Sequence, residues 1–303
     1  MSLINVKSES AVVFAVCCIW GILCQDFGYD GDNGPSNWGN TFSQCLGKHQ
    51  SPIDIETHNV VNKHFHQLRF ENFDQQIGIG LFENNGHTVM MKILSDKLPL
   101  IYGGPLQGSY KFEQLHFHWG PNDTIGSENQ INHHSFPLEM HIVMYNTKYG
   151  YSKASVTPGG LTVLSYLTSV SAQDNKHYDK LEEGLHQVQN IFSNSTIYNV
   201  GTLNDLIAKN RHRYYTYEGS LTTPPCSEAV TWIEFEDTIP LSAEQISAFR
   251  LLSTKTGRLT HNYRPTQPLN GRIIFYNNTS GFKGNVLSVS IALFVIFIYY
   301  SVF

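Results

Sequence analysis

Three histidines in two short segments have the spacing of a metal site. His116 and His118 lie two residues apart within the run Phe112–Trp119. Because alternate residues of a strand point to the same face, both imidazoles should project together. His141 lies on a second extended run, Leu138–Tyr145, which could pair beside the first. Three neutral imidazoles that converge and leave a fourth position open are typical of a catalytic zinc site, whereas a closed structural site usually has four ligands that include thiolates.

Two polar residues near these histidines favour the metal interpretation. The chain has 14 histidines, so a single H-x-H pair is a weak signal. However, Gln114 lies two residues before His116, and Glu139 lies two residues before His141. Metal-bound histidines usually donate the N–H of their second ring nitrogen to a carboxylate, amide or carbonyl. A glutamate buried on an otherwise apolar strand is costly unless it has such a partner.

A second segment of chemical interest is Glu218–Pro225, with the sequence EGSLTTPP. The two prolines fix φ and stiffen the loop that follows Thr222 and Thr223. Such a loop, taken alone, would be a surface turn. Beside a zinc site, however, it could present a hydroxyl to solvent bound at the metal.

Short strands should position these residues. The runs whose β-branched and aromatic content predicts strands are Phe112–Trp119, Leu138–Tyr145, Ala229–Phe235 and Arg272–Tyr276. The few segments with helical signals are Gly160–Ser169, Asp179–Ile191 and Ser242–Leu251. No internal repeat, low-complexity segment or long linker divides the chain. The sequence therefore predicts a mainly β (α+β) protein with peripheral short helices.

The beginning of the chain has the pattern of a secretory signal. Residues 1–24 place Lys7 before a 13-residue apolar run, Ala11–Leu23. This pattern predicts a signal peptide that is cleaved near Cys24. A membrane anchor is the alternative, although the run is short for a transmembrane span.

The end of the chain has the pattern of an anchor signal. The 18 residues Val286–Phe303 contain no charge, glycine or proline, and they follow a polar spacer and the small residues Asn278–Ser280. This pattern predicts attachment of a glycosylphosphatidylinositol (GPI) anchor at Asn278, with removal of residues 279–303. A transmembrane helix is the alternative. Both interpretations place the protein at an outer membrane surface.

The segment 25–278 should form one β-rich domain. It carries 18 basic and 24 acidic side chains, a net charge of −6, which does not favour nucleic-acid binding. Of the chain's five cysteines, Cys45 and Cys226 remain after removal of the signal peptide, which implies one disulfide in an oxidising compartment. The N-glycosylation sequons that fit this compartment are Asn122, Asn194, Asn277 and Asn278.

The chain resembles the α-type carbonic anhydrases from about Gly28 to Tyr276. The motifs that carry the resemblance, in order, are Asn33–Pro35 with Trp38, Gln50–Ile55, Asn84–His87, Gln114–Gly120, Gly126–Glu128, Glu139–His141, Ser220–Pro225 and Asn262–Pro265. The resemblance implies a single domain around a large twisted, mostly antiparallel sheet, with zinc at the base of a conical cleft. It also implies reversible hydration of carbon dioxide to bicarbonate and a proton by zinc-bound hydroxide.

The resemblance assigns the metal site. It implies that His116, His118 and His141 hold Zn²⁺ with water in the fourth position, a geometry for which carbonic anhydrase is itself the reference case. The residues that would orient these ligands are Gln114 for His116, Glu139 for His141, and the backbone carbonyl of Asn262 for His118.

The resemblance also assigns the catalytic and substrate-binding residues. Thr222 would accept a hydrogen bond from the zinc-bound hydroxide and direct its own hydroxyl hydrogen to Glu128, and His87 would be the proton shuttle. The polar residues that would hold connecting waters are Tyr29, Asn85 and Thr223. The apolar residues that would line the carbon dioxide pocket are Val143, Val163, Leu221, Val230 and Trp232.

Two residues depart from the family pattern. Met90 stands where many relatives carry a polar residue, so water order and inhibitor fit should differ. Asn129 stands where a histidine is frequent, so the resemblance does not determine how the residues around Glu128 pack. Cys45 and Cys226 coincide with the disulfide of extracellular relatives, and their bridge should brace the loop of Thr222.

The resemblance leaves three classes of function to compare. The first is a GPI-anchored enzyme at the extracellular face of the plasma membrane, with sulfonamide and anion inhibitors and with bicarbonate or proton transporters as candidate partners. The second is a binding module, because some relatives keep the fold but lose metal-binding histidines. The third is an esterase activity of the same site. The complete set of histidines favours the enzyme.

Overall fold

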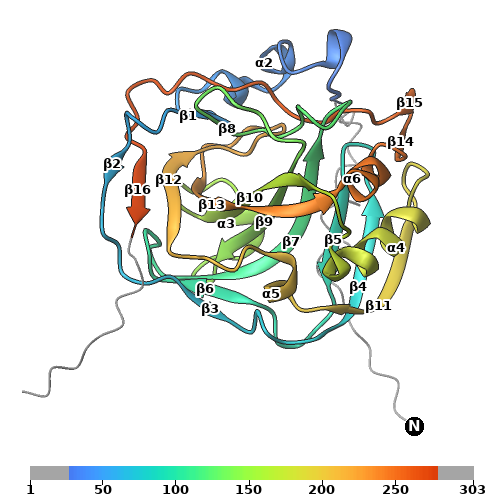
Figure 1. The fold of residues 1–303 in the computed structure, drawn as a ribbon. Helices are drawn as coiled ribbons and strands as arrows, with labels where there is room; N and C mark the ends of the chain where they lie inside the picture. Colours follow the sequence, from blue (N-terminus) through green and yellow to red (C-terminus); the bar gives the residue numbers. More distant parts are fainter. Residues whose placement is uncertain (1–26, 279–303) are drawn as a thin grey trace, which may run out of the picture.

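A large twisted mixed sheet dominates the computed structural model, which describes residues 27–278 (Figure 1). The sheet has 12 strands in the order β11-β4-β5-β7-β9-β10-β13-β12-β16-β2, and β6 joins β3 to β7 beside this path. Its strands are β2 (Val61–Asn62), β3 (Arg69–Glu71), β4 (Ile77–Asn84), β5 (Val89–Ile93), β6 (Leu100–Tyr102), β7 (Ser109–Trp119), β9 (Leu138–Asn146), β10 (Leu161–Ser171), β11 (Asn194–Gly201), β12 (Arg213–Gly219), β13 (Val230–Ser242) and β16 (Phe275–Asn278). The mostly antiparallel β architecture is therefore confirmed.

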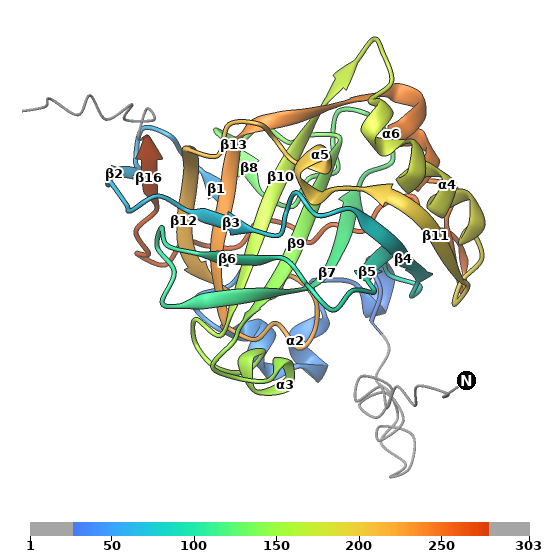
Figure 2. The ribbon, with the colours of Figure 1, turned by 90° about the horizontal axis from the view of Figure 1, so that it is seen from below.

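Short helices and two small sheets complete the described part of the chain. The helices are η1 (Gly31–Asn33), α2 (Trp38–Thr41), η2 (Ser43–Leu46), α3 (Tyr151–Ala154), η3 (Lys176–Tyr178), α4 (Asp179–Gln187), α5 (Leu203–Leu206) and α6 (Ala243–Phe249). The small sheets pair β1 (Asp54–Ile55) with β8 (Gln130–Ile131), and β14 (Ser253–Thr254) with β15 (Gly257–Arg258). Figure 2 shows α4 and α6 together beside β11, on the side of the molecule away from β2 and β16.

The two ends predicted to be processing signals, 1–24 and 279–303, lie outside the described residues. Within residues 27–278, no helix has both the length and the apolar composition needed to cross a membrane.

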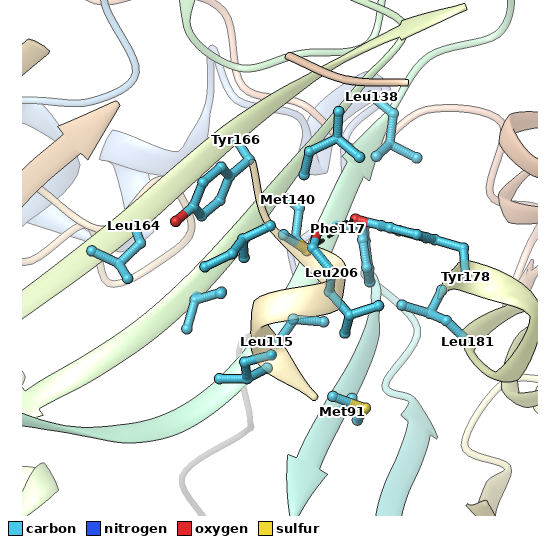
Figure 3. Packing of buried hydrophobic residues seen from close by; sticks show 14 of the residues in the cluster. Met91, Leu115, Phe117, Leu138, Met140, Leu164, Tyr166, Tyr178, Leu181 and Leu206 are labelled. Atoms are coloured by element: carbon cyan, nitrogen blue, oxygen red, sulfur yellow. Dashed lines mark hydrogen bonds between the residues drawn. The ribbon is translucent and has the colours of Figure 1, made fainter. Parts of the chain in front are cut away.

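The central strands separate the main core from the histidines. β7 and β9 pair side by side, as the sequence predicted; the pairing is antiparallel, and His116 lies directly opposite His141. Because side chains alternate along a strand, Leu115 and Phe117 point away from the histidines. Figure 3 shows both of them packed with Met140 in the main core, where all three are at most 1% exposed.

The helix predicted over Gly160–Ser169 is wrong, because this segment forms strand β10. β10 lies between β9 and β13 in the middle of the sheet, and its residues from Leu161 to Thr168 are all buried. A strand covered on both faces needs apolar side chains at successive positions, so it lacks the alternation that marks a strand exposed on one face. A short apolar run of this kind cannot be assigned from periodicity alone.

Two other predicted elements are confirmed with shifted bounds. The helix expected over Asp179–Ile191 ends at Gln187. The helix expected from Ser242 is α6, and Ser242 caps it by accepting a hydrogen bond from the Gln245 backbone N–H.

The last predicted strand begins three residues later than expected, at Phe275. The side chain of Arg272 instead donates hydrogen bonds to the backbone carbonyls of Gln50, Glu218 and Leu269, which hold this segment as a loop.

Candidate metal centre

Three histidine ring nitrogens converge on one point at the surface of β7 and β9. The candidate ligand atoms of His116, His118 and His141 all lie within 4.8 Å of one another. His118 and His141 are each 1% exposed, whereas His116 is half-buried. A small molecule would therefore approach the cluster from the side of His116.

A hydrogen bond at the other ring nitrogen sets the tautomer of each histidine. The three bonds are His116 Nδ1 to Gln114 Oε1 at 2.8 Å, His118 Nδ1 to the Asn262 carbonyl at 2.8 Å, and His141 Nε2 to Glu139 Oε1 at 2.7 Å. Amide, carbonyl and carboxylate oxygens accept hydrogen bonds, so these ring nitrogens carry the N–H. The nitrogens that face the cluster are therefore unprotonated and present lone pairs.

This donor set fits a metal cation. His116 Nε2 lies 3.1 Å from His118 Nε2, and with both tautomers fixed no proton lies between the two nitrogens. Two lone pairs at this distance repel, and a cation between them would convert the repulsion into ligation. Burial lowers the pKa of His116 well below its usual value, and neighbouring His118 lowers it further. Burial, followed by His141, lowers the pKa of His118 to about 3, so both ligands stay neutral.

Glu139 accepts an unusually large number of hydrogen bonds. Its Oε2 accepts from the backbone N–H groups of Glu128 and Asn129 at 2.7 and 2.8 Å. Its Oε1 accepts from Ser165 Oγ at 2.6 Å and from Asn129 Nδ2 at 2.9 Å, in addition to His141. Burial alone would raise the pKa of Glu139. The neighbouring His141 and the hydrogen bonds from His141 and Ser165 lower this pKa by more than burial raises it, so the carboxyl is held as the anion.

Glu128 lies beneath the histidines with one oxygen directed toward them. Its Oε1 accepts from the Arg264 backbone N–H at 2.9 Å. Its Oε2 lies 3.3 Å from His118 Nε2 and 4.0 Å from His141 Nδ1. Burial, and then the negative charge of Glu139, raise the pKa of Glu128 well above its usual value, while the Thr222 hydroxyl opposes this shift.

An apolar wall adjoins the cluster. Val143, Val163 and Trp232 lie in register across β9, β10 and β13. The Trp232 ring centroid is 5.0 Å from that of His141. The five residues predicted to line the substrate pocket belong to one apolar cluster, in which Leu221 is partly buried and the others are at most 2% exposed: Val143, Val163, Leu221, Val230 and Trp232.

His87 lies at the edge of a separate surface pocket of about 220 Å³. Tyr29 and Asn85 also line this pocket, whereas Thr223 does not. The Asn85 side chain holds the turn, because its Oδ1 accepts from the backbone N–H groups of His87 and Thr88 at 2.9 Å. Sequence reasoning missed Phe27, whose ring stacks on His87 with 3.9 Å between centroids, because nothing in its local sequence marks it.

Cys45 and Cys226 form the predicted disulfide, with 4.9 Å between their Cα atoms and 181 residues between them in sequence. The bridge joins η2 to the segment that follows Pro225. Gln50 Nε2 donates to the Cys226 carbonyl at 3.2 Å, and the Arg264 guanidinium donates to the Cys45 carbonyl at 3.2 Å. The loop that carries Thr222 is thus attached to the N-terminal part of the domain.

The structure distinguishes the predicted glycosylation sites. Asn122, Asn194 and Asn278 are exposed. Asn277 is 3% exposed and its Nδ2 donates to the His212 carbonyl at 2.7 Å, so the folded structure disfavours a glycan there, and the prediction at Asn277 stays a prediction.

The fold and the donor set define a zinc metalloenzyme with three histidines on neighbouring strands. The family of eukaryotic-type carbonic anhydrases matches residues 33–278 of the chain. Carbonic anhydrase 7 of Mus musculus and of Homo sapiens are each 35% identical over 256 residues, which is 82% of this chain and 96% of each relative. Putative carbonic anhydrase 3 of Caenorhabditis elegans is 36% identical over 250 residues, which is 82% of this chain and 95% of the relative.

The chain therefore belongs to the carbonic anhydrase family. It is a zinc enzyme that hydrates carbon dioxide, and the three-histidine cluster fits its zinc site.

Proposed function

We propose that this carbonic anhydrase works at the extracellular face of the plasma membrane, with Zn²⁺ on His116, His118 and His141 and with His87 as its proton shuttle. The observation that carries the assignment of the ligands is the convergence of three unprotonated ring nitrogens. Gln114, Glu139 and the Asn262 carbonyl act as the orienting partners, because each accepts the N–H of one ligand.

Bound zinc supplies a Lewis acid that lowers the pKa of water to about 7, the effect for which carbonic anhydrase is the reference case. Thr222 and Glu128 orient the attacking solvent. In the proposed arrangement the Thr222 hydroxyl, which opposes the rise in the pKa of Glu128, would donate a hydrogen bond to that carboxyl, and its lone pair would then accept a hydrogen bond from the solvent. A ligand without a proton to donate leaves this acceptor unpaired, which explains why sulfonamides with an N–H group should inhibit and why simple anions should bind differently.

The apolar wall fits carbon dioxide. Carbon dioxide has no net charge and no dipole, so it loses little hydration free energy when it moves from water into a pocket of valine, leucine and tryptophan side chains. Val143 and Trp232 lie on the same face as the ligand His141, which keeps this pocket beside the metal.

His87 is suited to carry the proton to solvent. An imidazole can accept and release a proton near physiological pH. His87 borders a pocket that Tyr29 and Asn85 also line, and the polar groups of these two residues are proposed to hold connecting waters, with Thr223 as a third such residue outside this pocket.

The extracellular location is supported by features of three kinds. The Cys45–Cys226 disulfide favours an oxidising compartment. The exposed sequons at Asn122 and Asn194 are compatible with glycosylation there. The apolar segments at both ends of the sequence have the patterns of a signal peptide and of a GPI attachment signal near Asn278. Bicarbonate or proton transporters would be natural neighbours of an enzyme in this position.

Stopped-flow hydration of carbon dioxide tests the enzymatic proposal directly. Zinc-loaded protein should hydrate carbon dioxide, chelation of the metal should abolish the activity, and added zinc should restore it. The exposed His64 provides a control, because His64→Ala should change neither zinc content nor rate. A protein with stoichiometric zinc and no hydration activity would exclude the enzyme and favour a binding module.

A further inference from the structure

A buried glutamate, Glu234, lies in the same cross-strand row as a predicted zinc ligand. His141 on β9 lies opposite Ser165 on β10, and Ser165 lies opposite Glu234 on β13. Glu234 is 0% exposed. None of the steps proposed above uses its carboxyl group, although burial of such a group is costly unless the group has a partner.

One amide group connects Glu234 to the residue that orients the ligand. Asn129 Nδ2 donates one hydrogen bond to Glu139 Oε1 at 2.9 Å and the other to Glu234 Oε2 at 3.0 Å. Asn129 Oδ1 accepts from the backbone N–H of Ile53 at 3.1 Å and from the Tyr217 hydroxyl at 3.0 Å. The Ile53 N–H can only donate, so it fixes which end of the amide faces the two carboxyl groups.

The two carboxyl groups differ in how their oxygens are paired. Both oxygens of Glu139 accept hydrogen bonds from several donors. Glu234 Oε2 accepts from Asn129, whereas Glu234 Oε1 has no hydrogen-bond partner among the described residues. Burial, and then the negative charge of Glu139, raise the pKa of Glu234 well above its usual value.

We propose that Glu234 is a positioning residue of the zinc site: its Oε2 holds the Asn129 amide against Glu139, and Glu139 in turn holds His141 in the orientation that binds zinc. This inference rests on the proposed roles of Glu139 and His141. Without Glu234, one N–H of Asn129 would be buried and unpaired, and the amide would turn toward other acceptors. Glu139 would then lose a donor and its fixed position.

Zinc release from the loaded protein tests this role. Glu234→Met removes the acceptor but keeps an unbranched side chain of similar length that adapts to the site. Because one buried Asn129 N–H loses its acceptor, some loss of thermal stability is expected in this variant, as in the control described below. We expect zinc release to a chelator to become at least about 10-fold faster, within the range for loss of an outer-shell partner of a metal ligand, and faster than in a control with a similar loss of stability.

Glu234→Gln is the conservative variant. Its side-chain carbonyl can still accept from Asn129, and it is uncharged, so zinc release should stay within about twofold of the wild-type rate. Thr162→Val is the matched control on β10, where Thr162 Oγ1 donates to the Thr231 carbonyl at 2.8 Å. This change also removes a buried hydrogen bond, but it lies on the opposite face of the strand and should not alter zinc release.

Each alternative outcome would overturn the proposal. Unchanged zinc release in Glu234→Met would show that the amide does not need this carboxyl, and equally fast release from Glu234→Gln would show that the charge matters instead. Equal acceleration by Thr162→Val would indicate a general loss of packing. Failure of Glu234→Met to fold would show that Glu234 is needed for folding and not specifically for positioning the zinc ligand. Zinc release is measured without carbon dioxide, so these results are independent of the hydration assay.

Discussion

At the scale of single residues, each zinc ligand is prepared by a partner that accepts its second N–H. His118 is one example, because it is 1% exposed and its Nδ1 lies 2.8 Å from the Asn262 carbonyl. Fixed tautomers mean that the free energy of metal binding is not spent on reorienting the rings.

His118→Ala should remove zinc and activity together. The change deletes one of three ligands and leaves the buried Asn262 carbonyl without its donor. Zinc content should fall well below stoichiometric, and carbon dioxide hydration should fall in proportion. Metal analysis and stopped-flow kinetics on the same sample check this, and a variant with full zinc content and wild-type rate would remove His118 from the ligand set.

His87→Ala should slow proton export without affecting the metal. Hydration in weak buffer should fall by up to about 10²-fold, the lower end of the range for loss of a proton-transfer group. Exchange between carbon dioxide and bicarbonate at equilibrium should remain near the wild-type rate. Added imidazole should restore much of the lost hydration rate, and a variant that does not respond to imidazole would show that the protons leave by another path.

At the scale of elements, the site depends on strands and loops that are far apart in the chain. β7 and β9 provide the ligands, β10 provides Ser165, and the loop after β12 provides Thr222. The disulfide attaches that loop to η2 near the beginning of the domain. Constraint of this loop should therefore affect both stability and catalysis.

Replacement of Cys45 and Cys226 by serine should lower both stability and activity. The bridge closes a loop of 181 residues, and the chain-entropy model assigns such a loop about 5 kcal/mol of stabilisation. Denaturant unfolding of the zinc-loaded double variant measures the loss, and reduction of the wild-type protein provides the matched comparison. Unchanged stability in both samples would contradict the role assigned to the bridge.

At the scale of the whole molecule, the arrangement of the domain is compatible with attachment at its C-terminal end. β16 pairs with β12, and Asn278, where the anchor is proposed, lies opposite Arg213 in this pairing. Every residue assigned to the site lies upstream of this strand. Release of the domain from a membrane should therefore leave the active site complete.

Phosphatidylinositol-specific phospholipase C should release active enzyme from intact cells. A chain that ends after Asn278 should be secreted in active form, because it retains the pairing of β16 with β12. An epitope placed after Phe303 should be absent from the mature protein. Retention of that epitope on cells, together with no release by the phospholipase, would instead identify a transmembrane helix.

The mature protein should carry glycans at exposed sequons only. Asn122→Gln and Asn194→Gln should each reduce the mass that peptide N-glycosidase F removes, because both asparagines are exposed. Asn277→Gln is the matched comparison and should not reduce it, because Asn277 is buried and hydrogen-bonded. A glycan mapped to Asn277 by mass spectrometry would contradict this.

The sequence alone determined the features that depend on local spacing or on a small set of partners. The period of a strand places His116 and His118 on one face, and it places Gln114 and Glu139 beside their ligands. If residues 1–24 are removed as the sequence predicts, Cys45 and Cys226 can pair only with each other, and they form a disulfide in the structure. The motifs were sufficient to identify the family, because many short sequence patterns occur in the same order as in the carbonic anhydrases.

Only the tertiary structure decided the features that depend on contacts between distant segments. β10 is a strand because β9 and β13 cover both its edges and its residues are buried on both faces, which the periodicity of its own residues cannot show. Asn129 donates both to Glu139 and to Glu234, which is 105 residues away in sequence, and the buried Asn277 donates to the carbonyl of His212. Burial and hydrogen bonding of a polar side chain are set by the neighbours that the fold brings to it.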